Sequence, residues 1–463
     1  MKNDIEYYFD FQTPGRVELR CQGKDRPAPE VDLAVKFFVN DSAIASEFSS
    51  VVDSLLADAI DVAVAAHMAD RLVLRERPLP TGNGPFNRRM RLRVAVRNPE
   101  VWAAQDIQRN LVRTLEYLTQ DLWEFEFTQC SCGRASDQQQ HLFGKAIPEL
   151  VDVGLFSGGL DSFAGTAAAF DEGGDRHFIG VSASPSNIHA ARQSRQFYQL
   201  QSAFGRHGSH ISIRYSMMEA SRLSQERTRR TRGFVFLILG CVVARSTSAA
   251  RLHVYENGIG AINLPYDLSQ VGIDNTRAMH PRTLRNVASL VSKLTGTSFS
   301  IENRSLLLTK GQMCSHPALG RVADFISDTF SCDGWTHAGA HCGYCTSCLL
   351  RRQSLEFAGL AARDTDQYLN DCTSGEWKPI RGRLRGLSAM TWQATRLERS
   401  LNSARPWREL ISEFPELQTA ANELEIERDE DLVRQSLLHL YRSYVYEWFR
   451  FSGLRHLPMQ LAA

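Results

Sequence analysis

Residues 151–162 read VDVGLFSGGLDS, and this stretch decides the fold that we expect for the chain. The apolar residues of 151–156 predict a short buried strand, and the small and apolar residues of 160–170 predict a packed helix. A glycine turn between a strand and a helix N-terminus directs backbone N–H groups at an anion, and the helix dipole favours negative charge there. The stretch therefore predicts an anion-binding turn.

Residues 157–162 also carry side chains that suit a phosphate site. The two glycines let the backbone approach an anion closely because they lack a Cβ atom, and Ser157 and Ser162 add hydroxyl donors. The carboxylate of Asp161 is suited to holding a magnesium ion beside phosphate oxygens. For Ser-Gly-Gly alone, an ordinary helix cap explains the sequence equally well. A Walker-type phosphate loop is absent from the chain, which disfavours kinase and P-loop NTPase chemistry.

From residue 149 to about 300, within a domain that we expect to span 149–365, short apolar runs alternate with helical patterns. We expect strands at 151–156, 178–181, 211–215, 252–255 and 298–301, and helices at 160–170, 187–204, 233–245 and 283–294. Such alternation predicts an α/β fold with a doubly wound, parallel, five-stranded sheet that binds ligands at the carboxyl ends of its strands. The turn at 157–162 follows one of these ends.

Two further regions flank this one. Residues 1–148 predict a separate α+β accessory or docking domain, and residues 366–463 predict a helical C-terminal region. The N-terminal pattern has strands at 31–39, 90–96 and 123–127, helices at 51–67 and 101–118, and an exposed loop at 78–85; the tail has an amphipathic helix at 432–448. Cys130 and Cys132 lack a nearby partner pair, so we interpret them as free thiols in a linker rather than half a metal site.

Polar residues near other predicted strand ends are candidates for ligand contacts. Arginines crowd into 227–232, and Arg232 lies nearest the start of a buried helix, where it can reach a phosphate; a run of arginines also suits a solvated face. Glu256 and Asn257 follow the strand at 252–255. With Arg277 and His280 they are candidates to read the edge of a heterocycle or hold a carboxylate, although a lone loop histidine is more often structural.

Four cysteines form the pattern Cys332-x9-Cys342-x2-Cys345-x2-Cys348. Four thiolates at such spacings can close tetrahedrally around Zn²⁺ and leave no open position, which predicts a structural zinc site. An iron–sulfur cluster is the alternative, since four cysteines also suit it.

The overall composition narrows the class of protein. The 463 residues contain 53 Lys and Arg against 52 Asp and Glu, so net charge gives no general case for nucleic acid or membrane binding. The N-terminus has no apolar signal region, and the longest apolar run, 234–244, is too short to span a bilayer. With its crowded cysteines, the chain is expected in a reducing cytoplasm.

The motif SGGLDS behind an apolar strand resembles the signature of the PP-loop ATP pyrophosphatases. Thr309-Lys310 before a predicted helix, FSC at 330–332 and HCGYCTSCLLRRQSLEFAG at 341–359 resemble the 7-cyano-7-deazaguanine synthase (QueC) family more specifically. The resemblance runs from about Val151 to Gly359. It implies that ATP binds at Ser157, Gly158, Gly159, Leu160, Asp161 and Ser162, and that the four cysteines hold structural zinc.

The resemblance also implies a reaction. A member of this family uses ATP and Mg²⁺ to adenylate the carboxylate of 7-carboxy-7-deazaguanine, releases pyrophosphate, and lets an amine capture the product. Asp161, Lys310 and Arg232 are then the expected catalytic residues. The family's Tyr-Pro-Asp-Cys-Arg segment is replaced by IDNTRAMHP at 273–281. With its added regions, the chain resembles the enlarged QueC-like proteins of bacterial antiphage defence operons more closely than the housekeeping synthase, and a protein of the same operon is a candidate amine donor.

Two other functions remain open at this stage. A PP-loop tRNA-thiolation enzyme would need a catalytic cysteine pair or an iron–sulfur cluster and a basic RNA face, which the near-neutral charge disfavours. A catalytically degenerate ATP-binding scaffold subunit is the other alternative; the intact SGGLDS speaks against it, and the altered segment at 273–281 leaves room for it.

Overall fold

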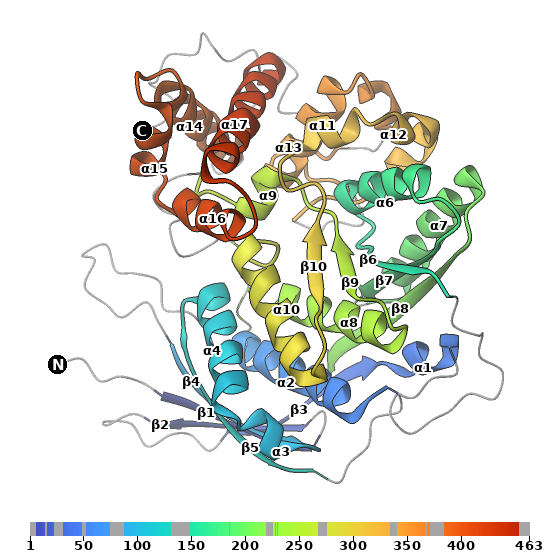
Figure 1. The fold of residues 1–463 in the computed structure, drawn as a ribbon, viewed down its shortest axis with the longest axis vertical. Coiled ribbons are helices and arrows are strands. Elements are labelled where there is room, and N and C mark those ends of the chain that lie inside the picture. Colours follow the sequence, from blue (N-terminus) through green and yellow to red (C-terminus); the bar gives the residue numbers. More distant parts are fainter. Residues whose placement is uncertain are drawn as a thin grey trace.

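The computed structural model describes residues 6–13, 16–22, 31–48, 52–74, 88–130, 149–184, 186–218, 226, 228, 230–266, 276–333, 340–365, 368–370 and 384–452. The fold is α/β, with helices packed on a sheet that runs through the N-terminal and central parts of the chain (Figure 1). The loop predicted at 78–85 and Cys132 lie outside the described residues.

The strands form one sheet of ten, in the order β10-β9-β6-β7-β8-β3-β2-β1-β4-β5. Their bounds are β1 (Glu6–Thr13), β2 (Arg16–Gln22), β3 (Val31–Asn40), β4 (Arg89–Val96), β5 (Leu122–Gln129), β6 (Val151–Leu155), β7 (His177–Ser184), β8 (Gly208–Met218), β9 (Arg251–Val254) and β10 (Ser300–Asn303). The prediction of a five-stranded sheet is therefore wrong in extent: the five strands from 151 onward are present and parallel, but they form only half of the sheet.

The central half of the sheet, β10-β9-β6-β7-β8, reverses its direction of growth between β6 and β9. Chain order runs from β6 outward through β7 to β8, then returns to β9 on the other side of β6. In open α/β sheets the crevice at such a reversal, beyond the carboxyl ends of the strands, is where ligands bind. The turn at 157–162 follows β6 and the residues from 255 onward follow β9, so both lie at this point.

Helices cover both faces of the central half. The helices of the N-terminal and central parts together are α1 (Ser42–Phe48), α2 (Ser54–Leu72), α3 (Pro99–Trp102), α4 (Gln105–Thr119), α6 (Leu160–Glu172), α7 (Asn187–Phe204), α8 (Arg232–Ser246), α9 (Gly258–Ile262) and α10 (Pro281–Thr295). Residues of α6 and α7 pack with Phe178 of β7 in one hydrophobic cluster, whereas residues of α8 and α10 pack with Ile179 in another. Adjacent residues of a strand face opposite sides, so the sheet is covered on each.

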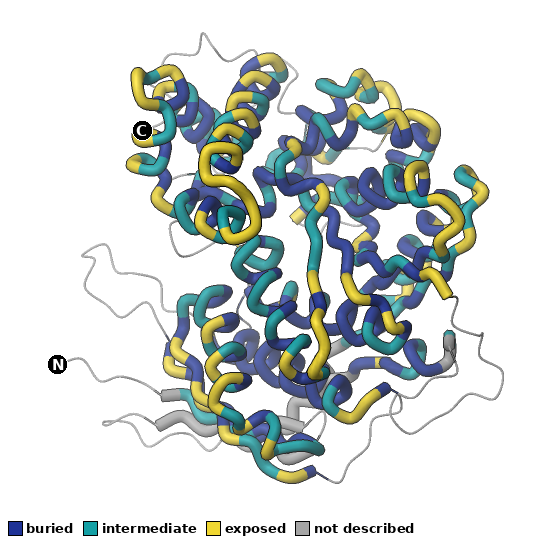
Figure 2. The backbone as a smooth tube through the Cα atoms, viewed as in Figure 1, coloured by how far each residue is buried: buried dark blue, intermediate teal, exposed yellow. Residues whose placement is uncertain are grey.

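The N-terminal region is not set apart from the central one. β3 pairs antiparallel with β8, from Lys36 opposite Met218 to Asn40 opposite Arg214. One hydrophobic core contains α2 and α4 together with α8 and α10, and in Figure 2 most of α2 and α8 is coloured dark blue as buried. The boundary expected near residue 148 thus falls between two strands of a single sheet that share a core.

The C-terminal part is helical, as expected, and packs on the strand ends. Its helices, with those of the preceding segment, are α11 (Lys310–Cys314), α12 (Pro317–Arg321), the 3-10 helices η3 (Ala323–Asp328) and η4 (Ala361–Arg363), α13 (Thr346–Phe357), α14 (Leu384–Leu401), α15 (Pro406–Glu413), α16 (Glu416–Glu425) and α17 (Glu430–Ser452). A separate core joins α14–α17 to α9 and α13. No helix among the described residues combines the length and apolar character that a membrane crossing requires.

Candidate active site and metal centre

A cavity of about 620 Å³ opens at the reversal point of the sheet. Several residues predicted from the sequence line it, namely Ser157, Ser162, Arg232, Glu256, Asn257 and Lys310. They come from the ends of β6 and β9 and from the starts of α6, α8 and α11, which are far apart in the chain. A volume of this size is typical of small-molecule sites.

The glycine turn adopts the backbone that its sequence predicts. Gly158 has a φ of 77°, and a Cβ atom there would lie 2.7 Å from Oε1 of Gln196; glycine is therefore required for both backbone and space. Ser157 Oγ lies 3.0 Å from Ser162 Oγ, and the amide of Gly159 donates to Ser157 Oγ at 3.3 Å. The hydroxyls thus lie at the start of α6, where backbone N–H groups lack helical partners.

Asp161 lies behind the cavity lining and contacts two residues that belong to it. Its Oδ1 is 3.2 Å from Nζ of Lys310, and its Oδ2 accepts from Nδ2 of Asn257 at 2.9 Å. The side chains of Asp161 and Lys310 are only 12% and 7% exposed, so this ion pair is largely shielded from water. Removing either partner would leave the other as a buried, uncompensated charge.

A second carboxylate, Glu256, lies beside this pair. Nδ2 of Asn257 donates to Oε1 of Glu256 at 3.1 Å as well as to Asp161. The pKa of Glu256 is raised well above its ordinary range, mainly because the side chain is buried and secondly because the charge of Asp161 repels it. Burial works against the charge of Lys310, but the two carboxylates outweigh it and raise the pKa of the lysine. The site therefore holds a charged lysine between two acids.

Lys310 owes its position to a helix cap. Thr309 is the N-cap of α11: its Oγ1 accepts from the amide of Gln312 at 3.0 Å, and its own amide donates to Oε1 of Gln312 at 2.8 Å. This reciprocal capping box fixes the first turn of the helix. Lys310 is the first residue of that turn and is directed at Asp161.

The segment before α8 is fixed by the N-terminal region. Arg232 begins α8 and lines the cavity. The preceding Thr231 donates through its amide and Oγ1 to Oδ2 of Asp70 on α2, at 3.2 and 2.8 Å. Oδ1 of Asp70 also pairs with Nη2 of Arg88 at 2.5 Å, and the same nitrogen is 2.6 Å from Oδ2 of Asp121. Three charged side chains that are 5% exposed or less thus hold the start of α8.

Arg277 and His280 do not line the cavity. Arg277 lies over the ring of Tyr117, with Cζ 4.9 Å from its centroid, and donates to the Tyr117 carbonyl at 3.2 Å. His280 is 2% exposed and caps α10 by accepting from the amide of Arg282 at 3.2 Å. Burial, with the neighbouring arginines, lowers its pKa to about 3. We therefore correct the sequence prediction and remove both residues from the candidate site.

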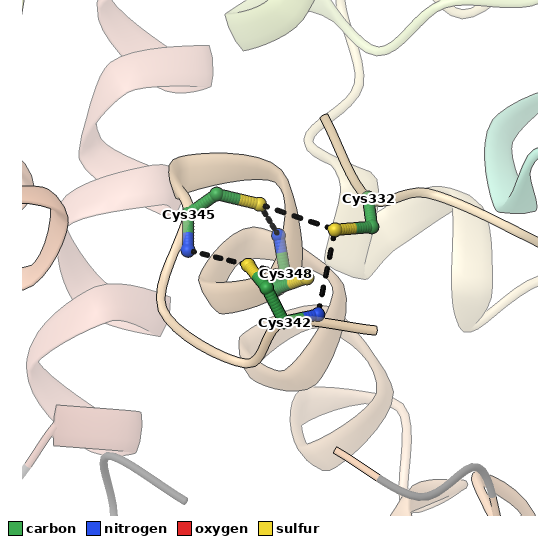
Figure 3. A group of neighbouring side chains, drawn as sticks. All are labelled: Cys332, Cys342, Cys345 and Cys348. Atoms are coloured by element: carbon green, nitrogen blue, oxygen red, sulfur yellow. Dashed lines mark hydrogen bonds between the residues drawn. The ribbon is translucent and has the colours of Figure 1, made fainter. Parts of the chain in front are cut away.

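The four predicted metal ligands converge as expected. The Sγ atoms of Cys332, Cys342, Cys345 and Cys348 all lie within 4.8 Å of one another (Figure 3). Sγ of Cys342 is 3.9 Å from that of Cys348, and Sγ of Cys345 is 4.0 Å from that of Cys332. A tetrahedral ion with Zn–S bonds of about 2.3 Å needs S–S separations of about 3.8 Å. The cluster could therefore hold a metal ion, and its geometry is compatible with zinc.

Backbone amides and one glycine shape this cluster. The amides of Cys342, Cys345 and Cys348 each donate to a neighbouring sulfur at 3.3–3.4 Å, which favours the thiolate form. Gly343 has a φ of 82°, and a Cβ atom there would lie 1.9 Å from the carbonyl of Asn370. The Cys-x-x-Cys turn thus needs glycine at this position.

The cysteine cluster adjoins the glycine turn. The amide of Phe330 donates to the carbonyl of Gly158 at 3.0 Å, and Oγ of Ser331 accepts from the amide of Leu160 at 3.4 Å. Both residues immediately precede Cys332. Arg351 on α13, which is fully buried, reaches the same segment by donating to Thr329 Oγ1 at 2.6 Å. The segment that leads into the cysteine cluster is thus hydrogen-bonded both to the glycine turn and to α13.

Sequence reasoning missed several residues at this site. Gln193 on α7 donates to the carbonyl of Ser157 at 2.9 Å, and Asp333 lines the cavity while accepting from Oγ of Ser347 at 2.7 Å. Tyr266 also lines it. Nothing in the spacing of Gln193 distinguishes it from a surface residue, whereas the position of Asp333 next to Cys332 was a usable signal.

The chain was also compared with known proteins. Scans against models of protein families and against curated proteins gave no match. What the site does must therefore be argued from its own geometry and chemistry.

Proposed function

We propose that the chain is a PP-loop ATP pyrophosphatase and carbon–nitrogen ligase, similar to the 7-cyano-7-deazaguanine synthases. Its substrate is the carboxylate of 7-carboxy-7-deazaguanine or a related deazapurine acid. The observation that carries the proposal is the meeting of the 157–162 turn with Lys310 and Arg232 around one cavity at the reversal point of the sheet. An anion-binding turn beside two cations suits a triphosphate.

The proposed reaction is an adenylation. A carboxylate oxygen of the acid attacks the α-phosphorus of ATP, the bond from that phosphorus to the bridging oxygen breaks, and pyrophosphate leaves. Ser157, Ser162 and the free N–H groups of α6 bind phosphate oxygens, while Lys310 and Arg232 neutralise charge on the leaving group. Catalysis of this kind consists mainly of positioning and electrostatic stabilisation.

Two metal ions belong to the proposal. Asp161, with Glu256 beside it, would hold Mg²⁺, which prefers carboxylate and phosphate oxygens and supplies charge neutralisation. The four cysteines would hold one structural Zn²⁺. Their sulfurs are too close together to enclose a multi-iron cluster, and four thiolates fill a tetrahedral site, so no position is left for a substrate.

The second half-reaction is capture of the acyl-adenylate by an amine. Ammonia is one candidate, and an amine of a partner protein from the same operon is the other. Because the resemblance is to enlarged defence proteins, we place the activity in bacterial antiphage defence in the cytoplasm. Docking of a partner would fall to exposed faces of the N-terminal region and of α14–α17.

An isotope-exchange assay tests the first half-reaction. Purified protein with labelled pyrophosphate, ATP and 7-carboxy-7-deazaguanine should form labelled ATP, and omission of the acid should abolish the exchange. Mass spectrometry after adding ammonia, or proteins encoded beside this chain, identifies the acceptor by a mass increase. Absence of exchange with ATP bound would favour the scaffold alternative. Sulfur transfer to tRNA would favour the thiolation alternative.

A further inference from the structure

Glu447 is a buried carboxylate in a helix whose inner face is otherwise apolar and aromatic. It lies on α17 and is 2% exposed, between Tyr444 and Trp448, which are fully buried. Burial of a carboxylate is unfavourable unless hydrogen bonds compensate it. A glutamate at such a position therefore has partners that explain it.

The partners of Glu447 lie at the start of α11, the helix that begins with Lys310, and on α13, the helix that contains Cys348. Its Oε1 accepts from the hydroxyl of Thr309, the N-cap of α11. Its Oε2 accepts from Nε2 of Gln353 on α13 at 2.7 Å. Thr309 and Gln353 are 1% and 0% exposed, so both contacts are sealed from water. One carboxylate thus ties together α11, α13 and α17.

The contact with Thr309 bears directly on Lys310. The Thr309 hydroxyl has one hydrogen, which it gives to Glu447, and it accepts from the amide of Gln312 to cap α11. Lys310 is the next residue, and its Nζ is 3.2 Å from Asp161. A Cβ atom on Gly311 would lie 2.5 Å from Oε2 of Glu447, so glycine permits the close approach of the two helices.

Helix α17 reaches a second segment of the cavity wall. Leu440 packs against the turn that follows β9: a Cβ atom on Gly258 would lie 2.7 Å from its Cδ2. Gly258 follows Asn257, which bridges Asp161 and Glu256. The inner face of α17 thus packs behind Thr309-Lys310 and behind Asn257-Gly258, the two segments that contact Asp161.

We propose that Glu447 is a positioning residue for Lys310. By holding the Thr309 hydroxyl, it fixes the first turn of α11 and so keeps the Lys310 ammonium beside Asp161 at the edge of the cavity. The role of Lys310 on the phosphates of ATP rests on the proposed function, whereas the placement of Lys310 by Glu447 does not.

The kinetic test compares Glu447→Gln with Glu430→Gln, which makes the same chemical change on the exposed first turn of α17. We expect Glu447→Gln to lower kcat for ATP–pyrophosphate exchange by about 10- to 100-fold, the scale of effect of a misplaced group. ATP affinity, measured by calorimetry, should change far less, and Glu430→Gln should match the wild type. An equal loss of affinity and kcat would overturn the proposal.

A double-variant test separates positioning from general loosening. In a Lys310→Ala background, Glu447→Gln should cause no further loss of exchange, because it acts through the lysine. Independent, multiplicative losses would contradict the proposal. Thr309→Val removes the hydroxyl that Glu447 holds, together with its cap on the Gln312 amide, without touching α17. It should lower exchange at least as far as Glu447→Gln does, even if that variant folds poorly.

A chemical readout keeps the proposal independent of activity. Lys310 is 7% exposed in its ion pair and should react slowly with an amine-acylating reagent, whereas Lys293, at 36% exposed, serves as an internal reference. Glu447→Gln should raise the labelling of Lys310 severalfold relative to Lys293. Unchanged labelling would refute the role of Glu447. If Glu447→Gln raises the labelling of Lys310 but the wild-type protein shows no exchange, the proposed function is refuted and the positioning role of Glu447 stands.

Discussion

At the scale of single residues, the site contains an ion pair, between Asp161 and Lys310, that we did not predict from the sequence. The motif SGGLDS suggests an accessible Asp161, but its carboxylate is mostly buried against Lys310 and Asn257. Truncation to alanine would leave the lysine facing only Glu256. Asparagine is therefore the informative substitution, since it removes the charge and keeps the volume.

We expect Asp161→Asn and Ser157→Ala to abolish ATP–pyrophosphate exchange. Ser157 is exposed at the turn, so its truncation should leave the midpoint of thermal unfolding nearly unchanged. Asp161→Asn should lower stability measurably, because Lys310 loses its closest counter-charge. Exchange at the wild-type rate in either folded variant would remove that residue from the site.

Glu447 also predicts a pH dependence of stability. Burial, only partly offset by the hydrogen bonds from Thr309, Gln353 and the Gly311 amide, raises its pKa from an ordinary 4.5 to about 7. The folded state thus resists ionisation of this group. As pH rises from about 4.5 to 7, Glu447 therefore lowers the free energy of unfolding more and more, and above pH 7 this loss stays constant. Glu447→Gln lacks this effect. The free energy of unfolding of Glu447→Gln, measured with urea and compared with that of the wild type, should rise by about 2–3 kcal/mol between pH 5 and pH 8. A difference between the two proteins that does not change with pH would contradict the assignment.

At the scale of elements, the pattern of the central half was predictable and the flanks less so. Every strand and helix expected between 151 and 301 is present within a few residues. These strands are short apolar runs, and the helices between them repeat apolar residues at helical spacing, so both patterns are clear in the sequence. β1 was overlooked, although Tyr7, Phe9 and Phe11 alternate along it. The contacts of Glu447 and Gln193 could not be predicted, since nothing in local sequence says which distant helix a buried polar residue will meet.

The metal-centre helix α13 should couple the cysteines to the glycine turn. We expect one zinc per wild-type chain, and we expect Cys348→Ser to lose the metal, to lower the unfolding midpoint and to weaken ATP binding, because residues 330–331 contact Gly158 and Leu160. Elemental analysis, calorimetry and hydrogen exchange of residues 156–162 measure these effects. Cys241→Ala, in the core on α8, should keep the metal. Full ATP affinity in a metal-free variant would show that the two sites are uncoupled.

At the scale of the whole molecule, the N-terminal region should be necessary for the site as well as for the fold. Asp70→Asn disrupts the buried pairing with Arg88 and the contacts to Thr231, so it should cost about 3 kcal/mol and reduce exchange by displacing Arg232. Asp58, equally buried on α2, pairs with Arg97 and does not reach the α8 start. Asp58→Asn should therefore destabilise comparably but spare kcat. Equal kinetic losses in the two variants would show only general destabilisation.

The joint between β3 and β8 has a further consequence for the newly made chain. Strand β3 ends at residue 40, whereas its partner β8 begins at residue 208, so this edge of β3 has no partner until β6, α6, β7 and α7 of the central region have also been synthesised. Pairings this distant in sequence form slowly. An unpaired edge offers its N–H and C=O groups to any other strand. The interval between the synthesis of β3 and that of β8 is therefore when the protein is most open to aggregation.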